Sequence, residues 1–116
     1  MDGMRHHAIV VTSLWPDVVA IRDSVAAIAP GLTSGVTKSL LNGYGSFFVA
    51  PDGSKESRPE SDDGDSVRNA VIIHLETYRY EDGSTSVDWA EVQYGDDSHE
   101  TYCPRDSDSL HPRARG

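Results

Sequence analysis

Two short hydrophobic segments with different periodicities constrain the fold of this chain most. Residues 8–12 form a run rich in β-branched side chains, which is typical of a buried central strand. After this run, apolar residues recur at spacings of three and four, the pattern of an amphipathic helix; they are Val18, Ile21, Val25 and Ile28. Pro30-Gly31 then predicts the end of the helix. The chain therefore begins with a strand followed by a helix.

The middle of the chain predicts a hairpin, a polar loop and a second helix. Residues 36–41 and 46–50 flank Asn42-Gly43, a dipeptide typical of hairpin turns because both residues accept positive φ; the turn has two or four residues. Residues 54–65 contain no apolar side chain, so we expect a solvated loop. A helix is predicted from a start within residues 62–66 to residue 79, although residues 71–75 are also rich enough in β-branched residues for a buried strand.

The remaining elements complete an α+β fold. Residues 86–94 and 99–103 are predicted strands, so the order of elements is β-α-β-β-α-β-β. This order is typical of a ferredoxin-like fold with an added strand, in which an antiparallel sheet carries both helices on one face. A chain of 116 residues has room for one core. We predict a single domain over residues 1–103 and a flexible C-terminal tail over residues 104–116.

Negative charge is concentrated in the second half of the chain. The net charge is −9, and residues 51–110 contain sixteen acidic residues against five basic ones. Such a field repels nucleic acids and anionic membranes and attracts basic protein surfaces. The alternative interpretation is that the acids only keep the protein soluble.

Compartment and redox state follow from what the sequence lacks. No apolar run is long enough to span a bilayer, and the first seven residues do not have the pattern of a signal peptide, so a cytoplasmic protein is expected. Cys103 is the only cysteine, which excludes an intramolecular disulfide and agrees with a reducing compartment.

No recognisable catalytic, cofactor or metal motif occurs in the sequence. The acidic segment at residues 61–65 does not match the EF-hand pattern, and no Gly-rich segment matches a phosphate-binding loop. His74 lies within the second predicted helix, where a hydrogen-bonded structural role is favoured over that of a base. His6 and His7 point to opposite faces if they continue the first strand. We therefore predict no catalytic residue, no cofactor and no metal site.

Aromatic side chains predict a binding surface. If Ala90, Val92 and Tyr94 face the helices, Trp89 projects from the open face of the sheet near Tyr44. Exposed aromatic residues next to acids are typical of protein-binding surfaces. The predicted partner-binding residues combine these aromatics with the acids of residues 52–65: Asp52, Glu56, Glu60, Asp62, Asp63, Asp65, Trp89 and Tyr44. The alternative is that the 54–65 loop or a second copy of the chain covers this face.

Three strings resemble segments of small, uncharacterised acidic proteins from bacteriophage and prophage genomes. They are residues 6–13 (HHAIVVTS), 42–56 (NGYGSFFVAPDGSKE) and 89–97 (WAEVQYGDD). The resemblance implies a phage accessory protein that disables host machinery, including nucleic-acid-handling defence proteins. It carries no known active site, so it assigns no functional residue.

These observations lead to one functional expectation and two rivals. We expect a non-enzymatic acidic protein-binding module that binds a basic host protein. It would be an anti-CRISPR-like phage inhibitor whose carboxylates mimic phosphates. A homodimer is a further expectation. The first rival is a small-molecule or metal-binding domain that uses His6, His7, His74 and nearby carboxylates. The second is a hydrolase with His74 as its base.

Overall fold

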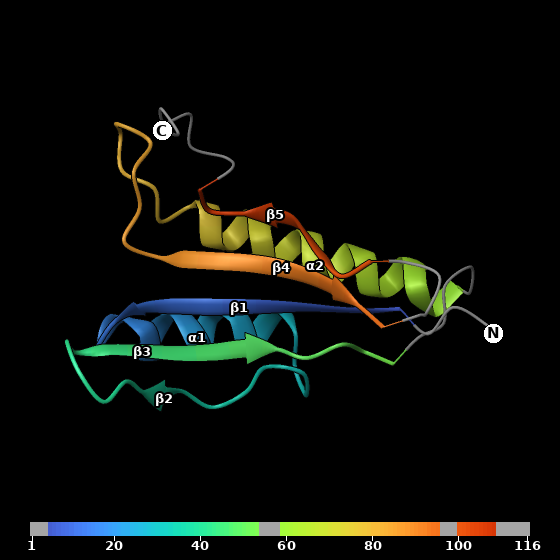
Figure 1. Ribbon diagram of the computed structural model, residues 1–116, viewed down its shortest axis with the longest axis horizontal. Coiled ribbons are helices and arrows are strands. Elements are labelled where there is room, and N and C mark those ends of the chain that lie inside the picture. The colour runs from blue at the N-terminus through green and yellow to red at the C-terminus, as the bar shows by residue number, and fades with distance from the viewer. Residues whose placement is uncertain (1–4, 54–58, 96–99, 109–116) are drawn as a thin grey trace.

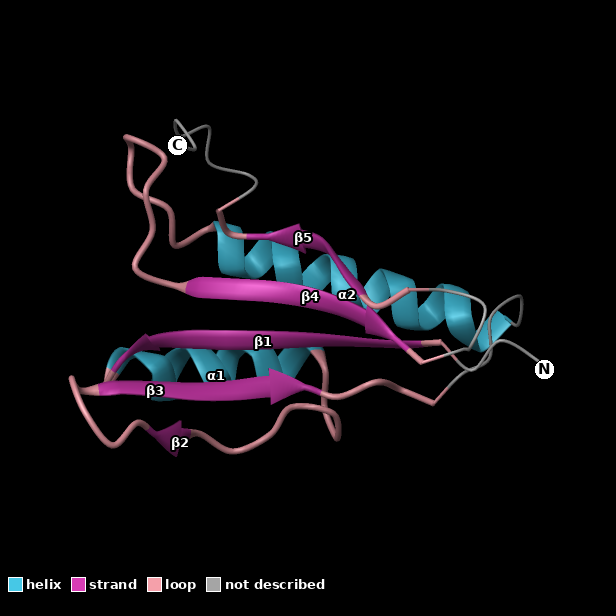
Figure 2. Cartoon of the chain, in the orientation of Figure 1, coloured by secondary structure: helices cyan, strands magenta, loops and turns pink. Residues whose placement is uncertain are grey.

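Two helices and one sheet make up the described part of the protein (Figures 1 and 2). The computed structural model describes residues 5–53, 59–95 and 100–108, with the side chains of residues 59–62 excepted. In chain order, the elements are β1 (His6–Leu14), α1 (Asp17–Ile28), β2 (Thr37–Lys38), β3 (Tyr44–Val49), α2 (Pro59–Glu76), β4 (Asp88–Tyr94) and β5 (Tyr102–Asp106). The fold is α+β, with two helices and one five-stranded antiparallel sheet, which confirms the predicted fold class.

Strand β1 lies at the centre of the sheet, as its β-branched sequence predicts. The strand order is β2-β3-β1-β4-β5, and β1 pairs antiparallel with both β3 and β4. Ile9 lies opposite Val49 on one side and Glu91 on the other. Since residues directly opposite share a face, one register sets the inner face across three strands. Figure 1 shows both helices on the same side of the sheet.

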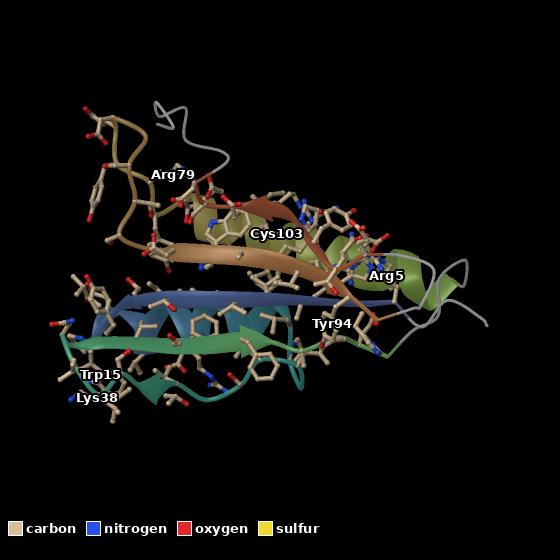
Figure 3. All side chains as sticks on the ribbon, viewed as in Figure 1. Arg5, Trp15, Lys38, Arg79, Tyr94 and Cys103 are labelled. Carbon is tan, nitrogen blue, oxygen red and sulfur yellow. The ribbon has the colours of Figure 1, made fainter. Side chains whose placement is uncertain are left out.

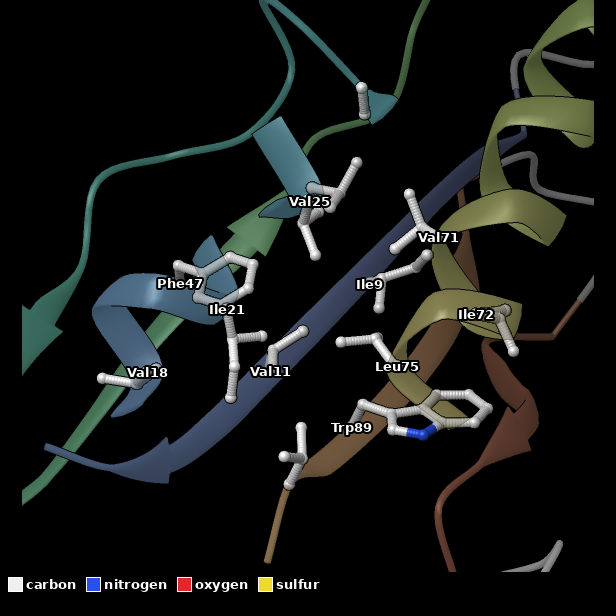
Figure 4. Packing of buried hydrophobic residues seen from close by; sticks show 13 residues of the cluster. Ile9, Val11, Val18, Ile21, Val25, Phe47, Val71, Ile72, Leu75 and Trp89 are labelled. Atoms are coloured by element: carbon white, nitrogen blue, oxygen red, sulfur yellow. The ribbon is translucent and has the colours of Figure 1, made fainter. Parts of the chain in front are cut away.

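The core lies between this inner face and the two helices (Figure 4). Helix α1 contributes the stripe predicted from its spacing, and Val18, Ile21 and Val25 are all buried. Helix α2 contributes Val71, Ile72 and Leu75. The sheet contributes Ile9, Val11, Phe47, Val49 and Trp89, with Val87 just before β4. Burial of these apolar side chains is the main force that holds the helices to the sheet.

Helix α2 begins earlier than the sequence predicts. Its first residue is Pro59, so residues 59–65 of the predicted loop are helical, and residues 54–58 lie outside the described residues. Proline fits the first turn of a helix because the N–H it lacks has no partner there, and acids near that end complement the helix dipole. The strand alternative for residues 71–75 is wrong, because they lie in α2. The predicted end was also too late, since α2 ends at Glu76.

The predicted hairpin joins β2 and β3, and residues 39–43 connect the two strands. Tyr44 and Gly45, which a four-residue turn between residues 41 and 46 would include, lie in β3 instead. Lys38 pairs with Gly45, and the N–H of Ser39 donates to the carbonyl of Tyr44 at 2.8 Å. Asn42 and Gly43 both have a φ of 69°, the positive value that the Asn-Gly dipeptide tolerates. Strand β2 has only two residues, so much less of residues 36–41 is strand than predicted.

The last strand starts three residues later than predicted and changes the domain boundary. Strand β5 runs from Tyr102 to Asp106 on the outer edge of the sheet and contains Pro104. Beyond it, the N–H of Ser107 donates to the carbonyl of Trp89 at 2.9 Å, and Ser107 is buried. The predicted tail boundary at residue 104 is therefore wrong, since residues 104–107 are part of the folded domain. Residues 109–116 lie outside the described residues.

Candidate protein-binding surface

Trp89 does not lie on the open face of the sheet, so its predicted place in a binding surface is wrong. It is only 3% exposed, and its indole N–H donates to the Glu76 carboxylate on α2 at 2.9 Å. Figure 4 shows it beside Leu75. The prediction assigned Ala90, Val92 and Tyr94 to the inner face because they are apolar or aromatic. The inner face of β4 instead carries Trp89 together with the polar residue Glu91.

Other aromatic and aliphatic side chains occupy the face that the helices leave uncovered. Val10 and Phe48 lie opposite each other at its centre, and each is 44% exposed. Leu14 pairs with Tyr44, one of the predicted partner-binding residues, and His6 pairs with Tyr94. We call these six residues the open face. They are exposed or half-buried, and none is Asp, Glu, Lys or Arg. The polar residues Thr12, Ser46 and Asp88 lie opposite one another on the same face, so the open face is a largely apolar surface interrupted by polar residues.

The predicted acidic residues do not gather beside the open face. Asp52, Asp63 and Asp65 are exposed, whereas Glu56 and the side chains of Glu60 and Asp62 lie outside the described residues. Asp52 and Asp63 line one pocket beside the first half of α2. Tyr44 begins β3, whereas Asp52 follows the other end of that strand. Among the predicted residues whose side chains are described, Tyr44 and Asp52 therefore lie at opposite ends of β3, and Trp89 lies in the core.

Three arginines bind carbonyl groups of the protein's own loops. Figure 3 labels two of them, Arg5 and Arg79. Arg5 donates to the carbonyls of Gly95 and Glu100, which holds the chain after β4 against the start of β1. Arg22 of α1 donates to the carbonyl of Ser34 at 2.8 Å. Arg79 donates to two backbone carbonyls and to the Glu76 carboxylate. Each of these arginines thus attaches a loop to the rest of the fold.

Two further arginines neutralise a buried carboxylate. Glu91 is 3% exposed, and its oxygens accept hydrogen bonds from Arg105 at 2.7 and 3.1 Å. Arg68 of α2 forms an ion pair with the same carboxylate at 3.5 Å and also contacts Asp65. The hydrogen bond to Glu91 is the main reason that the pKa of Arg105 is raised above its ordinary value. The Glu91 network joins β4, β5 and α2.

In the part of the chain that the structure describes, exposed carboxylates outnumber exposed cations. All five arginines that the structure describes are engaged with the chain's own carbonyls or carboxylates, and Lys38 lies over the Trp15 ring. Ten carboxylates in the same part of the chain are exposed: Asp17, Asp23, Asp52, Asp63, Asp65, Glu81, Asp82, Asp88, Glu100 and Asp108. Since exposed charges dominate the field that an approaching molecule meets, the field around the described surface is negative.

The histidines proposed as ligands or as a base stand on two elements, His6 and His7 on β1 and His74 on α2. His6 lies against Tyr94 with ring centroids 5.3 Å apart, while His74 of α2 contacts the hydroxyl of Tyr78 at 3.3 Å. The Glu91 carboxylate on β4 is bound by Arg68 and Arg105 and not by a histidine. Within the described residues, no three His, Cys, Asp or Glu side chains are placed to hold one metal ion.

Cys103 is exposed on β5, and the pKa of its thiol is raised above the ordinary value. Partial burial is the largest cause that raises the pKa of its thiol, followed by the charge of Asp106 and a hydrogen bond to that carboxylate. A raised pKa leaves less of the nucleophilic thiolate at neutral pH. The environment of Cys103 is thus the opposite of that of an activated cysteine.

Sequence reasoning missed the Glu91 network and the attachment of the arginines to carbonyls. Their partners are distant in the chain, and no local pattern indicates them.

In the part of the chain described, neither helix combines the length and apolarity needed to cross a bilayer. No protein-family model, curated protein or solved structure matches this chain.

Proposed function

We propose that this protein is a non-enzymatic acidic protein-binding module that binds a basic partner in the cytoplasm. The observation that carries the proposal is the unequal exposure of charge in the described residues. Ten carboxylates face solvent, two of which (Asp23 and Asp65) also pair with arginine, while the five arginines are buried or half-buried. An acidic field of this kind speeds encounter with basic surfaces and disfavours other acidic proteins.

The open face gives such a module an apolar contact area. Charge alone provides encounter rate and selectivity, whereas burial of aromatic and aliphatic side chains provides most of the affinity. Val10 and Phe48 would form the buried centre of the interface, and Tyr44 and Tyr94 would lie around it. Asp88, exposed at the start of β4, places a carboxylate near the rim.

We further propose a phage-type inhibitor of a host protein that handles nucleic acid, such as a defence protein. Its carboxylates would occupy a basic cleft that otherwise receives phosphates, and the protein would act by occlusion. The resemblance of three sequence strings to phage proteins and the acidic surface support this proposal.

A ferredoxin-like topology with one added edge strand is the fold we propose for this module. It is supported by the element order β-α-β-β-α-β-β, by the strand order β2-β3-β1-β4-β5 and by both helices lying on one face. The open face is the surface that this arrangement leaves free of helices.

Capture from bacterial lysate at low and high salt, followed by measurement with the purified partner, tests the binding proposal. We expect a basic, nucleic-acid-binding protein whose affinity for the module falls at least tenfold when NaCl rises from about 50 to about 300 mM, because salt screens exposed charges. Heparin should compete, since it presents the same negative charge. Affinity that resists both salt and heparin would contradict the proposal.

The open face also favours a homodimer as a second candidate function of this surface. Two copies could bury Val10 and Phe48 against each other while their exposed acids remain at the rim. Analytical ultracentrifugation should then show a dimer for the native chain and a monomer for Phe48→Asp. A native monomer at about 100 µM would exclude a dimer of moderate affinity.

A further inference from the structure

The connection between β2 and β3 carries the two most exposed large apolar side chains of the described residues. Leu40 is 100% exposed, and Leu41 is 76% exposed. Figure 1 shows this connection at the same end of the sheet as the turn between β1 and α1, which contains Trp15. We call Trp15, Lys38, Leu40, Leu41 and Tyr44 the hairpin tip. A single exposed leucine is ordinary on a protein surface, but several large apolar side chains gathered at one place mark a site of interaction.

Backbone hydrogen bonds hold the hairpin tip in place. The N–H of Trp15 donates to the carbonyl of Gly43 at 2.8 Å, which ties the turn after β1 to the hairpin. The N–H of Ser39 donates to the carbonyl of Tyr44 at 2.8 Å and closes the hairpin next to the two leucines. The leucines are therefore presented on an ordered turn, so less conformational entropy is lost when they are buried against another surface.

The hairpin tip differs in charge from the rest of this acidic protein. Residues 24–51 contain no Asp or Glu, and Lys38 is their only charged residue. Of the ten exposed carboxylates in the described residues, eight follow this segment in the chain, and Asp17 and Asp23 precede it. A basic protein would find no carboxylate on the hairpin tip to pair with, so this surface suits a different kind of partner.

The order of side chains along the hairpin tip matches that of a membrane interface. The leucines are the most exposed, and the aromatic rings of Trp15 and Tyr44 lie beside them with 40% and 39% exposure. The ammonium of Lys38 lies 5.3 Å from the centroid of the Trp15 ring, and Figure 3 labels both residues. At a bilayer surface, aliphatic side chains enter the acyl region, Trp and Tyr lie at the level of the headgroups, and Lys reaches the lipid phosphates. An apolar pocket of a protein would accept the leucines but does not require this order.

We infer that the hairpin tip inserts shallowly into the surface of a zwitterionic membrane. Leu40 and Leu41 would enter the boundary between headgroups and acyl chains, and Lys38 would approach the lipid phosphates. Zwitterionic lipids are favoured because the net charge of −9 is repelled by an anionic bilayer and not by a neutral one. Membrane binding does not depend on the basic partner proposed above, because the hairpin tip contains none of the exposed acids.

Co-sedimentation of the full chain with phosphatidylcholine vesicles tests membrane binding. We expect an apparent Kd in the millimolar range of lipid, weaker than the association constant of about 10⁴ M⁻¹ for a myristoyl chain. Lipids brominated on the acyl chain near the headgroup should quench Trp15, whereas Trp89 is buried and should not respond. Vesicles with about 30% phosphatidylglycerol should bind more weakly at low salt. Absence of binding or quenching with phosphatidylcholine, or tighter binding to the anionic vesicles, would overturn the inference.

Matched variants separate the hairpin tip from other exposed apolar residues. The double variant Leu40→Ser/Leu41→Ser should weaken vesicle binding at least about tenfold, since burial of even one leucine side chain is worth about that factor. Its urea midpoint should not fall, because these side chains are exposed and add little to the core. Ile73→Ser removes an aliphatic side chain that is 68% exposed on α2 and should leave binding unchanged. Equal weakening by both variants would mean nonspecific adsorption and would overturn the site.

The same double variant tests the rival occupant, an apolar pocket of another protein. Suppose that the native chain does not bind vesicles and that the double variant loses a protein captured by the native chain. The hairpin tip would then be a protein contact, and the membrane inference would be rejected. Failure of the partner capture described above, with vesicle binding retained, would reject the proposed function and leave the membrane site in place.

Discussion

Replacing Glu91 by alanine should lower the free energy of unfolding by about 3 kcal/mol. Breaking a buried ion pair costs roughly 3–5 kcal/mol, because the remaining charge is left without compensation. Here the loss falls at the lower end of that range. Arg105 is 38% exposed, so it can reach water, and it keeps its hydrogen bond to Asn69. Arg68 is only 11% exposed but keeps Asp65 as a partner.

Urea titration followed by tryptophan fluorescence provides the measurement. With an m-value of about 2 kcal/mol per molar, the midpoint should fall by about 1.5 M. The difference should persist at about 0.5 M NaCl, because salt screens buried pairs much less than exposed ones. Asp88→Asn on the same strand changes an exposed acid and should alter stability by less than about 0.5 kcal/mol. A loss below about 1 kcal/mol for Glu91→Ala would refute a structural role for the Glu91 network.

Three further predictions concern other contacts of the fold. Trp89→Phe should cost at least about 1.5 kcal/mol in thermal unfolding because the Glu76 carboxylate loses its indole donor; an unchanged midpoint would contradict this. Gly45→Ala should lower the free energy of unfolding in urea by about 1–3 kcal/mol, since its Cβ would lie 2.9 Å from two valine methyl groups. An unchanged free energy would mean that these valine side chains shift at no cost. Cys103 should react with iodoacetamide at pH 7.5 more slowly than a cysteine in an unstructured peptide, because its thiol pKa is raised. Asp106→Asn should accelerate this reaction by lowering the thiol pKa; a slower reaction of the variant would exclude the electrostatic cause.

The local patterns of the first half of the chain were sufficient to predict its elements. The β-branched run became the centre of β1, and the three-and-four spacing became the buried stripe of α1. The Asn-Gly dipeptide marked the hairpin turn, since positive φ is a property of those two residues alone. Each of these features depends on neighbours in the chain, which is why sequence reasoning found them.

The errors arose where distant residues decide the structure. Alternation along β4 gave two faces, but choosing the inner one required knowing that Arg68 and Arg105 neutralise Glu91. With that charge compensated, Trp89 on the same face can be buried, so the predicted binding surface lost its main aromatic residue. Likewise, the acids before residue 66 resembled a solvated loop, although the same residues suit the first turns of a helix that begins at Pro59.

The two edges of the sheet restrict how any other protein can join it. On one side the outermost strand, β5, contains Pro104, which has no N–H to donate to an added strand. On the other side, β2 offers only two residues of regular strand. Neither edge is a good template for extending the sheet into a neighbouring molecule, which also protects the protein against edge-to-edge aggregation. Recognition must then be carried by side chains, and point mutations rather than backbone changes should determine which molecules this protein accepts.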